Sequence, residues 1–215
     1  ALDRADAVAS TADGYLAEIS SQLRDADAIA VASANSAGLS DAEREAYQIE
    51  LDSIASNVER ITQTASFNGE RLFDGSSAVA TGAGSVALEE LSLSGIGRVE
   101  VDGVSYSLAD VVSGGGADLA SSPEIASRVI ASARDQIGTM RGRVGAFQAH
   151  HIEPERAQNA AATRNLSSAL SVIADTDFAA QTSELVRSGL LSASSASALL
   201  LGQQSTAHAL ALLAA

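Results

Sequence analysis

The last 28 residues of the chain read SGLLSASSASALLLGQQSTAHALALLAA, from Ser188 to Ala215, and contain no Asp, Glu, Arg or Lys. Leu and Ala recur throughout, proline is absent, and the only glycines are Gly189 and Gly202, so the segment is predicted to be helical. Its leucines cover much of the helix circumference, and helices that are apolar all round are normally buried. The tail is therefore expected to need a partner surface. A second copy of the chain is the natural partner, and an intramolecular core is the alternative.

The composition favours long helices over a deep globular core. Hydrophobic residues make up 46% of the 215, but aromatic residues only 3%. The net charge of −14 makes binding to nucleic acid or to an anionic membrane unfavourable. The chain has no cysteine, which excludes a disulfide framework and a thiolate metal site. The longest uninterrupted apolar run in the tail, Ala209–Ala215, is far shorter than the roughly 20 residues that cross a bilayer, so no membrane insertion is expected.

Two helices are predicted at residues 1–35 and 40–66. Ser40-Asp41-Ala42-Glu43 matches a capping box that starts the second helix. A short polar turn joins the helices, which are expected to fold back as an antiparallel hairpin. Apolar residues at three- and four-residue steps predict a coiled-coil-like seam, formed by Val8, Ala12, Tyr15, Ile19, Leu23, Ala26 and Ala30 in the first helix and by Tyr47, Leu51, Ile54, Val58, Ile61 and Ala65 in the second.

Residues 74–120 have a different character, because Gly and Ser rise and β-branched residues alternate with polar ones. Asp102-Gly103 lies between alternating apolar residues, which is typical of a two-residue hairpin turn. Residues 86–93 are a further candidate strand. The sequence therefore predicts a small β-rich insertion between the second and third helices.

A third helix is predicted at residues 123–174, with Ser122 as its cap and Pro123 in its first turn. Pro154 lacks an N–H group and is expected to kink it. Asp175-Thr176-Asp177 is interpreted as a joint, after which a terminal helix spans residues 176–215. The predicted seam of the third helix comprises Ile125, Val129, Ala133, Ile137, Met140, Val144, Phe147 and His151, and resumes at Leu166, Leu170 and Ile173.

These elements predict a mainly α protein. Residues 1–175 are expected to form an elongated rod of long antiparallel helices that carries the small β-hairpin insertion. The helix at 176–215 is expected to project from this rod.

Three strings in the sequence resemble bacterial flagellin. Residues 62–75, TQTASFNGERLFDG, are similar to a conserved stretch of that family, and residues 173–179, IADTDFA, resemble the string before its terminal helix. The segment from Ala198 to Leu213, with Gln203, Gln204 and a Leu-Ala-Leu-Leu ending, resembles the family's last residues. The resemblance covers nearly the whole chain and implies a flagellin-like helical core.

The resemblance implies a structural, secreted subunit of the extracellular flagellum that self-assembles for motility and is held by an export chaperone beforehand. The alternative in the same superfamily is a hook–filament junction protein. The family's N-terminal helical segment is expected to be missing from this chain, and without it no filament formation is expected. The side chains expected to form the self-assembly or chaperone-binding surface are Phe178, Leu185, Leu190, Leu191, Leu199, Leu200, Leu201, Leu210, Leu212 and Leu213.

Some flagellins also activate an innate receptor of the Toll-like class through a helix that matches residues before Ala34. The recognised version carries Arg and Glu where this chain has Asp25 and Ala28, within the region Arg24, Asp25, Asp27, Ala28 and Ile29. Binding to this receptor is therefore expected to be weak or absent.

No motif in the chain indicates an enzyme, a cofactor or a metal. His150 and His151 are adjacent, so on a helix they point roughly 100° apart and make a poor chelate. The glycine run Gly114–Gly116 lacks the Lys-Ser/Thr of a phosphate loop, and no Gly-x-Ser-x-Gly nucleophile motif occurs. A structural, self-assembling protein is therefore expected, rather than an enzyme.

Overall fold

The computed structural model describes residues 2–34 and 38–213, except for the side chains of residues 176–177 and 205–213. The chain divides into a compact unit, Ala1–Ala157, and a second unit, Gln158–Ala215, each considered by itself. As predicted, the fold is mainly helical, with long helices and small hairpins. The predicted boundary at residues 175 and 176 lies inside one continuous helix, so no joint interrupts the backbone there.

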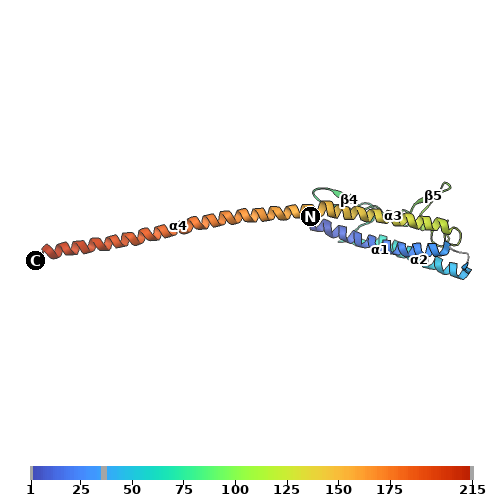
Figure 1. Cartoon of the computed structure of the whole chain (residues 1–215), viewed down its shortest axis with the longest axis horizontal. Helices are drawn as coiled ribbons and strands as arrows, with labels where there is room; N and C mark the ends of the chain where they lie inside the picture. Colours follow the sequence, from blue (N-terminus) through green and yellow to red (C-terminus); the bar gives the residue numbers. More distant parts are fainter. Residues whose placement is uncertain (1, 35–37, 214–215) are drawn as a thin grey trace. The chain divides into compact units, whose positions relative to one another are not determined.

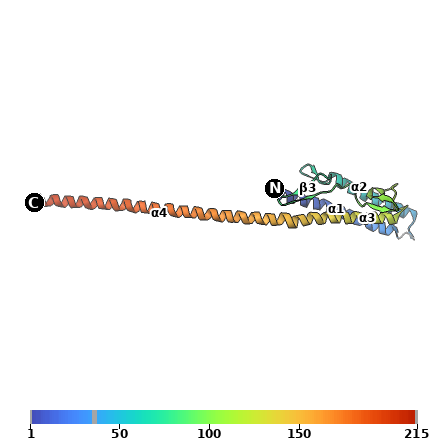
Figure 2. The same cartoon turned by 90° about the horizontal axis from the view of Figure 1, so that it is seen from above.

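Helix α1 (Leu2–Ala34) lies along α3 (Pro123–Phe147) in both views of the molecule (Figures 1 and 2). Three arginines link α1 to α3 and to the residues that follow it. Arg134 pairs with Asp27 at 2.5 Å, Arg141 with Asp13 at 3.0 Å, and Arg156 with Asp6 at 3.1 Å. The later an arginine stands in the sequence, the nearer its acidic partner lies to the start of α1. The two helices are therefore antiparallel, as predicted.

The buried residues of α1 and α3 alternate steps of four and three, which is the spacing of a coiled-coil seam. At two positions the predicted seam of α1 is wrong by one residue. Val8 and Tyr15 were predicted to lie in the seam, but they are half-buried beside it. The neighbouring residues Ala9 and Leu16 are fully buried in the seam. The buried seams consist of Ala5, Ala9, Ala12, Leu16, Ile19, Leu23, Ala26 and Ala30 in α1, and of Ala126, Ile130, Ala133, Ile137, Met140, Val144 and Phe147 in α3. Of the first two predicted seam residues of α3, Val129 is also fully buried and Ile125 is half-buried.

Helix α2 (Asp41–Thr64) begins at the predicted capping box. The Glu43 N–H donates to the Ser40 hydroxyl, and the Glu43 carboxylate accepts from the Ser40 N–H at 2.8 Å. The hydrogen bonds from Ser40, first from its backbone, lower the pKa of the Glu43 carboxyl. Of the predicted seam of α2, Tyr47 is half-buried, whereas Leu51, Ile54, Val58, Ile61 and the C-cap residue Ala65 are buried.

Three antiparallel hairpins occupy the segment between α2 and α3. They pair β1 (Ser66–Phe67) with β2 (Glu70–Arg71), β3 (Ala78–Ala80) with β4 (Ser85–Ala87), and β5 (Val99–Val101) with β6 (Val104–Tyr106). The predicted hairpin at Asp102-Gly103 is confirmed, with φ of 52° and 78° at these residues. The 3₁₀ helix η2 (Leu108–Asp110) follows it. Residues 86–93, a candidate strand, contribute only the last part of β4.

Between α3 and α4 (Glu153–Leu213) lies a π-helical turn, η3 (Gln148–Ile152). Its hydrogen bond from the Glu153 N–H to the Gln148 carbonyl spans five residues rather than four. The extra residue moves Ile152 into the core with no exposed surface, whereas His151 is half-exposed and stacks on Phe147 with ring centroids 4.8 Å apart. The prediction that His151 continues the seam is therefore wrong. The irregularity expected from Pro154 takes the form of this widened turn.

Candidate assembly surface

The main surface feature of the second unit is a helix whose apolar side chains are exposed to solvent. From residue 162 to residue 204, every described side chain is exposed. Twelve large apolar side chains along it are each between 61% and 74% exposed: Leu166, Leu170, Val172, Ile173, Phe178, Leu185, Val186, Leu190, Leu191, Leu199, Leu200 and Leu201. Isolated exposed leucines are ordinary, but a long run of them marks an interaction surface.

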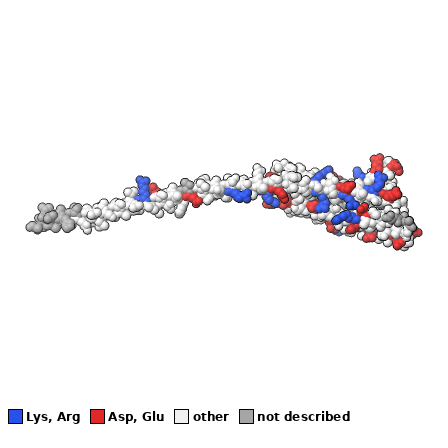
Figure 3. All heavy atoms as spheres, viewed as in Figure 1, with Lys and Arg blue, Asp and Glu red and all other residues white. Residues whose placement is uncertain are grey.

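The sequence explains why this segment is helical and why it has no separate apolar and polar faces. Helix α4 contains no glycine other than Gly189 and Gly202 among its described residues, and alanine and leucine are strong helix formers. Its apolar residues fall on all sides rather than on one stripe. Charge is sparse as well: residues 158–215 carry five charged side chains, the last of them at Arg187. Figure 3 shows how few acidic or basic atoms are visible along α4.

Most of the predicted assembly residues lie on this exposed surface. They are Phe178, Leu185, Leu190, Leu191, Leu199, Leu200 and Leu201, whereas the side chains of Leu210, Leu212 and Leu213 lie outside the described residues. Thr182 and Ser194 join Val186, Leu190 and Leu191 in lining a shallow groove along one side of the helix.

Leu166, Leu170 and Ile173 were predicted to continue the buried seam, and this prediction is wrong because all three are exposed. The buried seam of the compact unit ends at Ile152, and Arg156, which follows it, pairs with Asp3 and Asp6 of α1.

The same helix bears on the expectation that the chain does not insert into a membrane. Within the helical run Pro123–Gln204, one 18-residue window is apolar enough to cross a bilayer, judged by length and composition only, and none of it is buried. Such a window tolerates the Ser, Gly and Gln residues of this helix, whereas the uninterrupted apolar run Ala209–Ala215 is much shorter. The absence of membrane insertion stays a prediction.

The region expected to face an innate receptor lies on α1 in the compact unit. Arg24, Asp25 and Ala28 are exposed or half-exposed, and Asp27 is half-exposed and paired with Arg134. Ile29 is only 7% exposed and packs in the core, because it lies beside Ala30 on the seam face of α1. The Ile29 side chain therefore cannot form part of a receptor-facing surface in this conformation.

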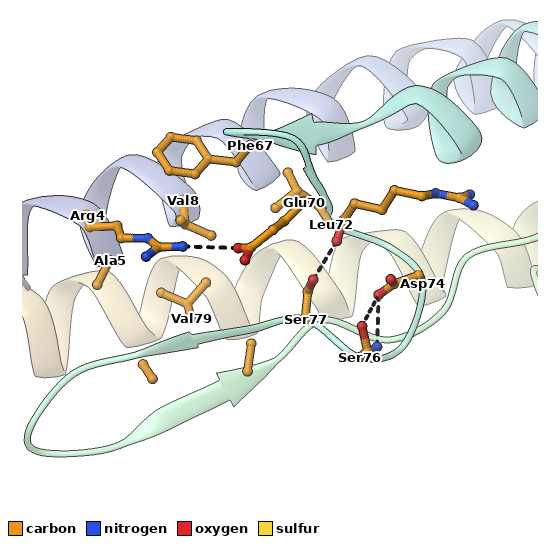
Figure 4. A pocket seen from close by; sticks show the side chains of 13 residues that line it. Arg4, Ala5, Val8, Phe67, Glu70, Leu72, Asp74, Ser76, Ser77 and Val79 are labelled. Carbon is orange, nitrogen blue, oxygen red and sulfur yellow. Dashed lines mark hydrogen bonds and ion pairs between the residues drawn. The ribbon is translucent and has the colours of Figure 1, made fainter.

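A groove of the compact unit lies between α1 and the hairpin segment (Figure 4). Several of its polar groups form hydrogen bonds or ion pairs. Arg4 pairs with Glu70 at 3.0 Å, Ser76 donates to Asp74 at 2.8 Å, and the Ser77 hydroxyl donates to the Arg71 carbonyl. Among the described residues, no group of three or more His, Cys, Asp or Glu side chains could hold a metal ion. The Arg4–Glu70 pair links the hairpin segment to α1, whereas the other two contacts lie within the segment, and none of the three is a nucleophile–base pair.

Comparisons with known proteins agree with the helical layout. Residues 3–78 match the family model of the bacterial flagellin N-terminal helical region. Over 201 residues the chain is 28% identical to the flagellar filament 30.7 kDa core protein of Treponema maltophilum, covering 85% of this chain and 67% of that protein.

Two solved flagellin structures share the fold. FliC from Burkholderia pseudomallei superposes with a TM-score of 0.53 at 16% identity, covering 67% of this chain and 99% of that one. Bacillus cereus flagellin superposes with a TM-score of 0.53 at 18% identity, covering 75% of this chain and 93% of that one. At such identities the superpositions establish the fold alone. The chain therefore has a flagellin-like fold, and its residues 3–78 are similar to the bacterial flagellin N-terminal helical region.

Proposed function

We propose that this protein is a structural subunit of the flagellar filament and that α4 beyond residue 157 supplies its main assembly surface. The single observation that carries this assignment is the exposure of twelve large apolar side chains on one helix in a chain related to a filament core protein. Burying a leucine or valine side chain contributes about 1.5–3 kcal/mol. Covering even a few of the twelve therefore offers a strong driving force for association with other flagellin subunits.

The charge distribution supports the same surface. Residues 188–215 carry no Asp, Glu, Arg or Lys, so no fixed charge of this segment has to be desolvated when the helix enters an interface. The run of small residues Ser192–Ala198 separates Leu190 and Leu191 from Leu199, and small side chains allow neighbouring helices to approach closely. A partner helix of the same composition, such as a second copy, fits this surface without unpaired charge.

Analytical ultracentrifugation of the full chain and of a chain that ends at residue 177 tests this proposal. We expect the full chain to self-associate with increasing concentration and the shortened chain to sediment as a monomer. A full chain that remains monomeric, with sedimentation unchanged by the truncation, would contradict the proposal.

A pair of point variants separates the apolar surface from a general effect of added charge. Leu190→Glu introduces a carboxylate on α4, and Val104→Glu introduces one at an exposed valine of the β5–β6 hairpin. Leu190→Glu is expected to weaken self-association at least roughly tenfold, because a buried unpaired carboxylate costs several kcal/mol. Val104→Glu is expected to leave self-association unchanged.

The export chaperone is a second proposed partner of the same surface. A helix that exposes twelve large apolar side chains needs cover before assembly, and secretion to the extracellular flagellum would follow release from that cover. Pull-down of a flagellar export chaperone by the full chain, and its loss on removing residues 178–215, is the expected result. Equal capture by both chains would place the chaperone site elsewhere.

The Toll-like receptor is proposed to respond weakly or not at all, since Asp25 and Ala28 replace the Arg and Glu that the resemblance leads one to expect. A reporter-cell assay tests this, and a full response would contradict it. A hook–filament junction protein remains the alternative within the superfamily, although Phe67-Asn68-Gly69 and the Leu-Leu ending favour a filament subunit. If the full chain instead floats with lipid vesicles, the apolar helix serves a membrane rather than a filament.

A further inference from the structure

The tip of the β1–β2 hairpin consists of Asn68 and Gly69, which connect Phe67 to Glu70. Their φ angles are 52° and 85°, as in a type I′ turn, whose two central residues are both left-handed. Both residues are exposed to solvent, and a Cβ at Gly69 would meet no atom within 4 Å. Water and hydroxide therefore reach the peptide bond between them freely.

An asparagine that precedes a glycine brings an electrophile and a nucleophile together. The deprotonated backbone nitrogen of Gly69 attacks the side-chain carbonyl carbon of Asn68. The bond from this carbon to the side-chain nitrogen breaks, and ammonia leaves with a proton from water. Water then opens the resulting succinimide ring, at the side-chain carbonyl to give aspartate or at the backbone carbonyl to give isoaspartate. The net reaction consumes one water and releases one ammonia.

The other asparagines in the described helices are poorly placed for this reaction. Asn57 lies in α2, and Asn159 and Asn165 lie in α4. The residues that follow them are Val, Ala and Leu, and their side chains crowd the ring closure that glycine allows. In a helix the attacking backbone N–H is also held by a hydrogen bond to the preceding turn.

The two Asp-Gly dipeptides are less reactive than Asn68-Gly69, because an ionised carboxylate is a poor electrophile. Hydrogen bonds from Ser76, first from its backbone N–H, lower the pKa of the Asp74 carboxyl and keep it ionised. A Cβ at Gly75 would also lie 3.3 Å from the Glu90 Cβ, so that peptide is packed against its neighbours. Asp102-Gly103 forms the same kind of turn as Asn68-Gly69 but presents a carboxylate instead of a neutral amide.

The folded turn slows the reaction, so the hairpin tip has to open. In a type I′ turn the first central residue has a ψ angle of roughly +30°, which turns the next backbone nitrogen away from its side chain. The base of the hairpin is firm, because the Leu72 N–H donates to the Ala65 carbonyl at 3.0 Å and both side chains are buried. Beyond this base the two strands share two residue pairs, and so short a hairpin opens locally with ease.

An exposed ion pair holds the tip to α1. Arg4 pairs with Glu70 at 3.0 Å, and Figure 4 shows the arginine reaching from α1 to the hairpin. The two side chains are 62% and 72% exposed, and pairs of this kind contribute little. The pair therefore slows the opening of the tip without preventing it.

We propose that Asn68 is a site of spontaneous modification, converted to aspartate and isoaspartate at a rate set by opening of the β1–β2 tip. The proposal is independent of the assembly assigned to α4. Both products place a new carboxylate close to Glu70. Isoaspartate also adds a methylene group to the backbone of a two-residue turn, so Phe67 and Glu70 lose their present register. The reaction thus changes the charge and the shape of the groove between α1 and the hairpin segment.

A time course of the full chain in mildly alkaline buffer tests the proposal. Digestion and mass spectrometry measure amide loss at each asparagine, and a synthetic peptide of residues 62–75 in the same buffer gives the rate without the folded turn. Over several half-lives of the peptide, we expect aspartate and isoaspartate at Asn68 and an intact amide at Asn57, Asn159 and Asn165. An intact Asn68 at the end of this period, or earlier conversion at one of the other three, overturns the proposal.

Two variants of the full chain test whether opening of the tip sets the rate. Arg4→Gln removes the ion pair with Glu70, whereas the matched control Arg24→Gln removes an exposed arginine that donates to the Ser20 carbonyl on its own helix. We expect Arg4→Gln to speed conversion roughly twofold to fivefold, as loss of an exposed pair allows, and Arg24→Gln to leave it unchanged. Amide hydrogen exchange at residues 67–70 should rise in the same proportion. Equal conversion rates in the two variants overturn the control of the reaction by the tip.

Discussion

Helix α3 and the part of α4 beyond residue 157 are both alanine-rich helices, yet their surroundings differ completely. The seam residues of α3 are at most 5% exposed, whereas the large apolar residues of α4 are at least 61% exposed. Helix α3 also carries Asp, Glu and Arg, and three of its four arginines, Arg134, Arg141 and Arg143, pair with acidic groups of α1 and of the segment between α2 and α3. Helix α4 loses its fixed charges after Arg187.

The difference shows that an apolar helix becomes part of a core only where a neighbouring helix packs against it. Helix α1 packs against α3, and the pairs Arg134–Asp27 and Arg141–Asp13 link the two helices. From residue 162 to residue 204 every described side chain of α4 is exposed, so this part of the helix depends on its own backbone hydrogen bonds until another protein covers it.

Truncating one leucine of the compact unit and one leucine of α4 gives the largest expected difference in the free energy of unfolding. Leu16→Ala removes a fully buried seam residue and is expected to lower the free energy of unfolding by about 2–5 kcal/mol, because it leaves a cavity. Leu190→Ala removes an exposed side chain and is expected to change it by less than about 0.5 kcal/mol. Urea unfolding at concentrations where the chain is monomeric measures both values. Similar losses for the two variants would mean that α4 is buried within its own chain.

Local signals predicted much of the fold, whereas positions that depend on distant partners were predicted less well. The capping box at Ser40 and the Asp102-Gly103 turn are complete within four residues, and both were found. The seam of α1 was ambiguous because Val8 is more apolar than Ala9, and only close packing against α3 selects the smaller residue. The π turn could not be seen from periodicity, since the regular spacing of the seam leads to His151 and not to Ile152.

A buried amide in the compact unit should give the next largest effect. The Gln48 amide donates to the Val111 carbonyl at 3.1 Å and accepts from the Leu119 N–H at 2.8 Å, which ties the loop before α3 to α2. Gln48→Leu leaves both backbone groups without this partner and is expected to cost about 1–3 kcal/mol in thermal or urea unfolding. The matched control is Gln63→Leu, because the exposed Gln63 side chain donates to Glu59 on its own helix. A loss at Gln63 equal to that at Gln48 would contradict the role of the loop contacts.

Two glycines test whether the regions on either side of residue 157 unfold together. A Cβ at Gly138 of α3 or at Gly189 of α4 would meet no atom within 4 Å, so alanine fits both sites. Each Gly→Ala change should favour its helix by about 0.8–1 kcal/mol, since alanine loses less backbone freedom than glycine. Gly138→Ala is expected to raise the global free energy of unfolding by that amount. Gly189→Ala should slow amide hydrogen exchange in α4 alone, because that helix can fray without opening the compact unit. An equal rise in global stability from both variants would show that the two regions form one cooperative unit, and the contrast between α3 and α4 would then lie in exposure only.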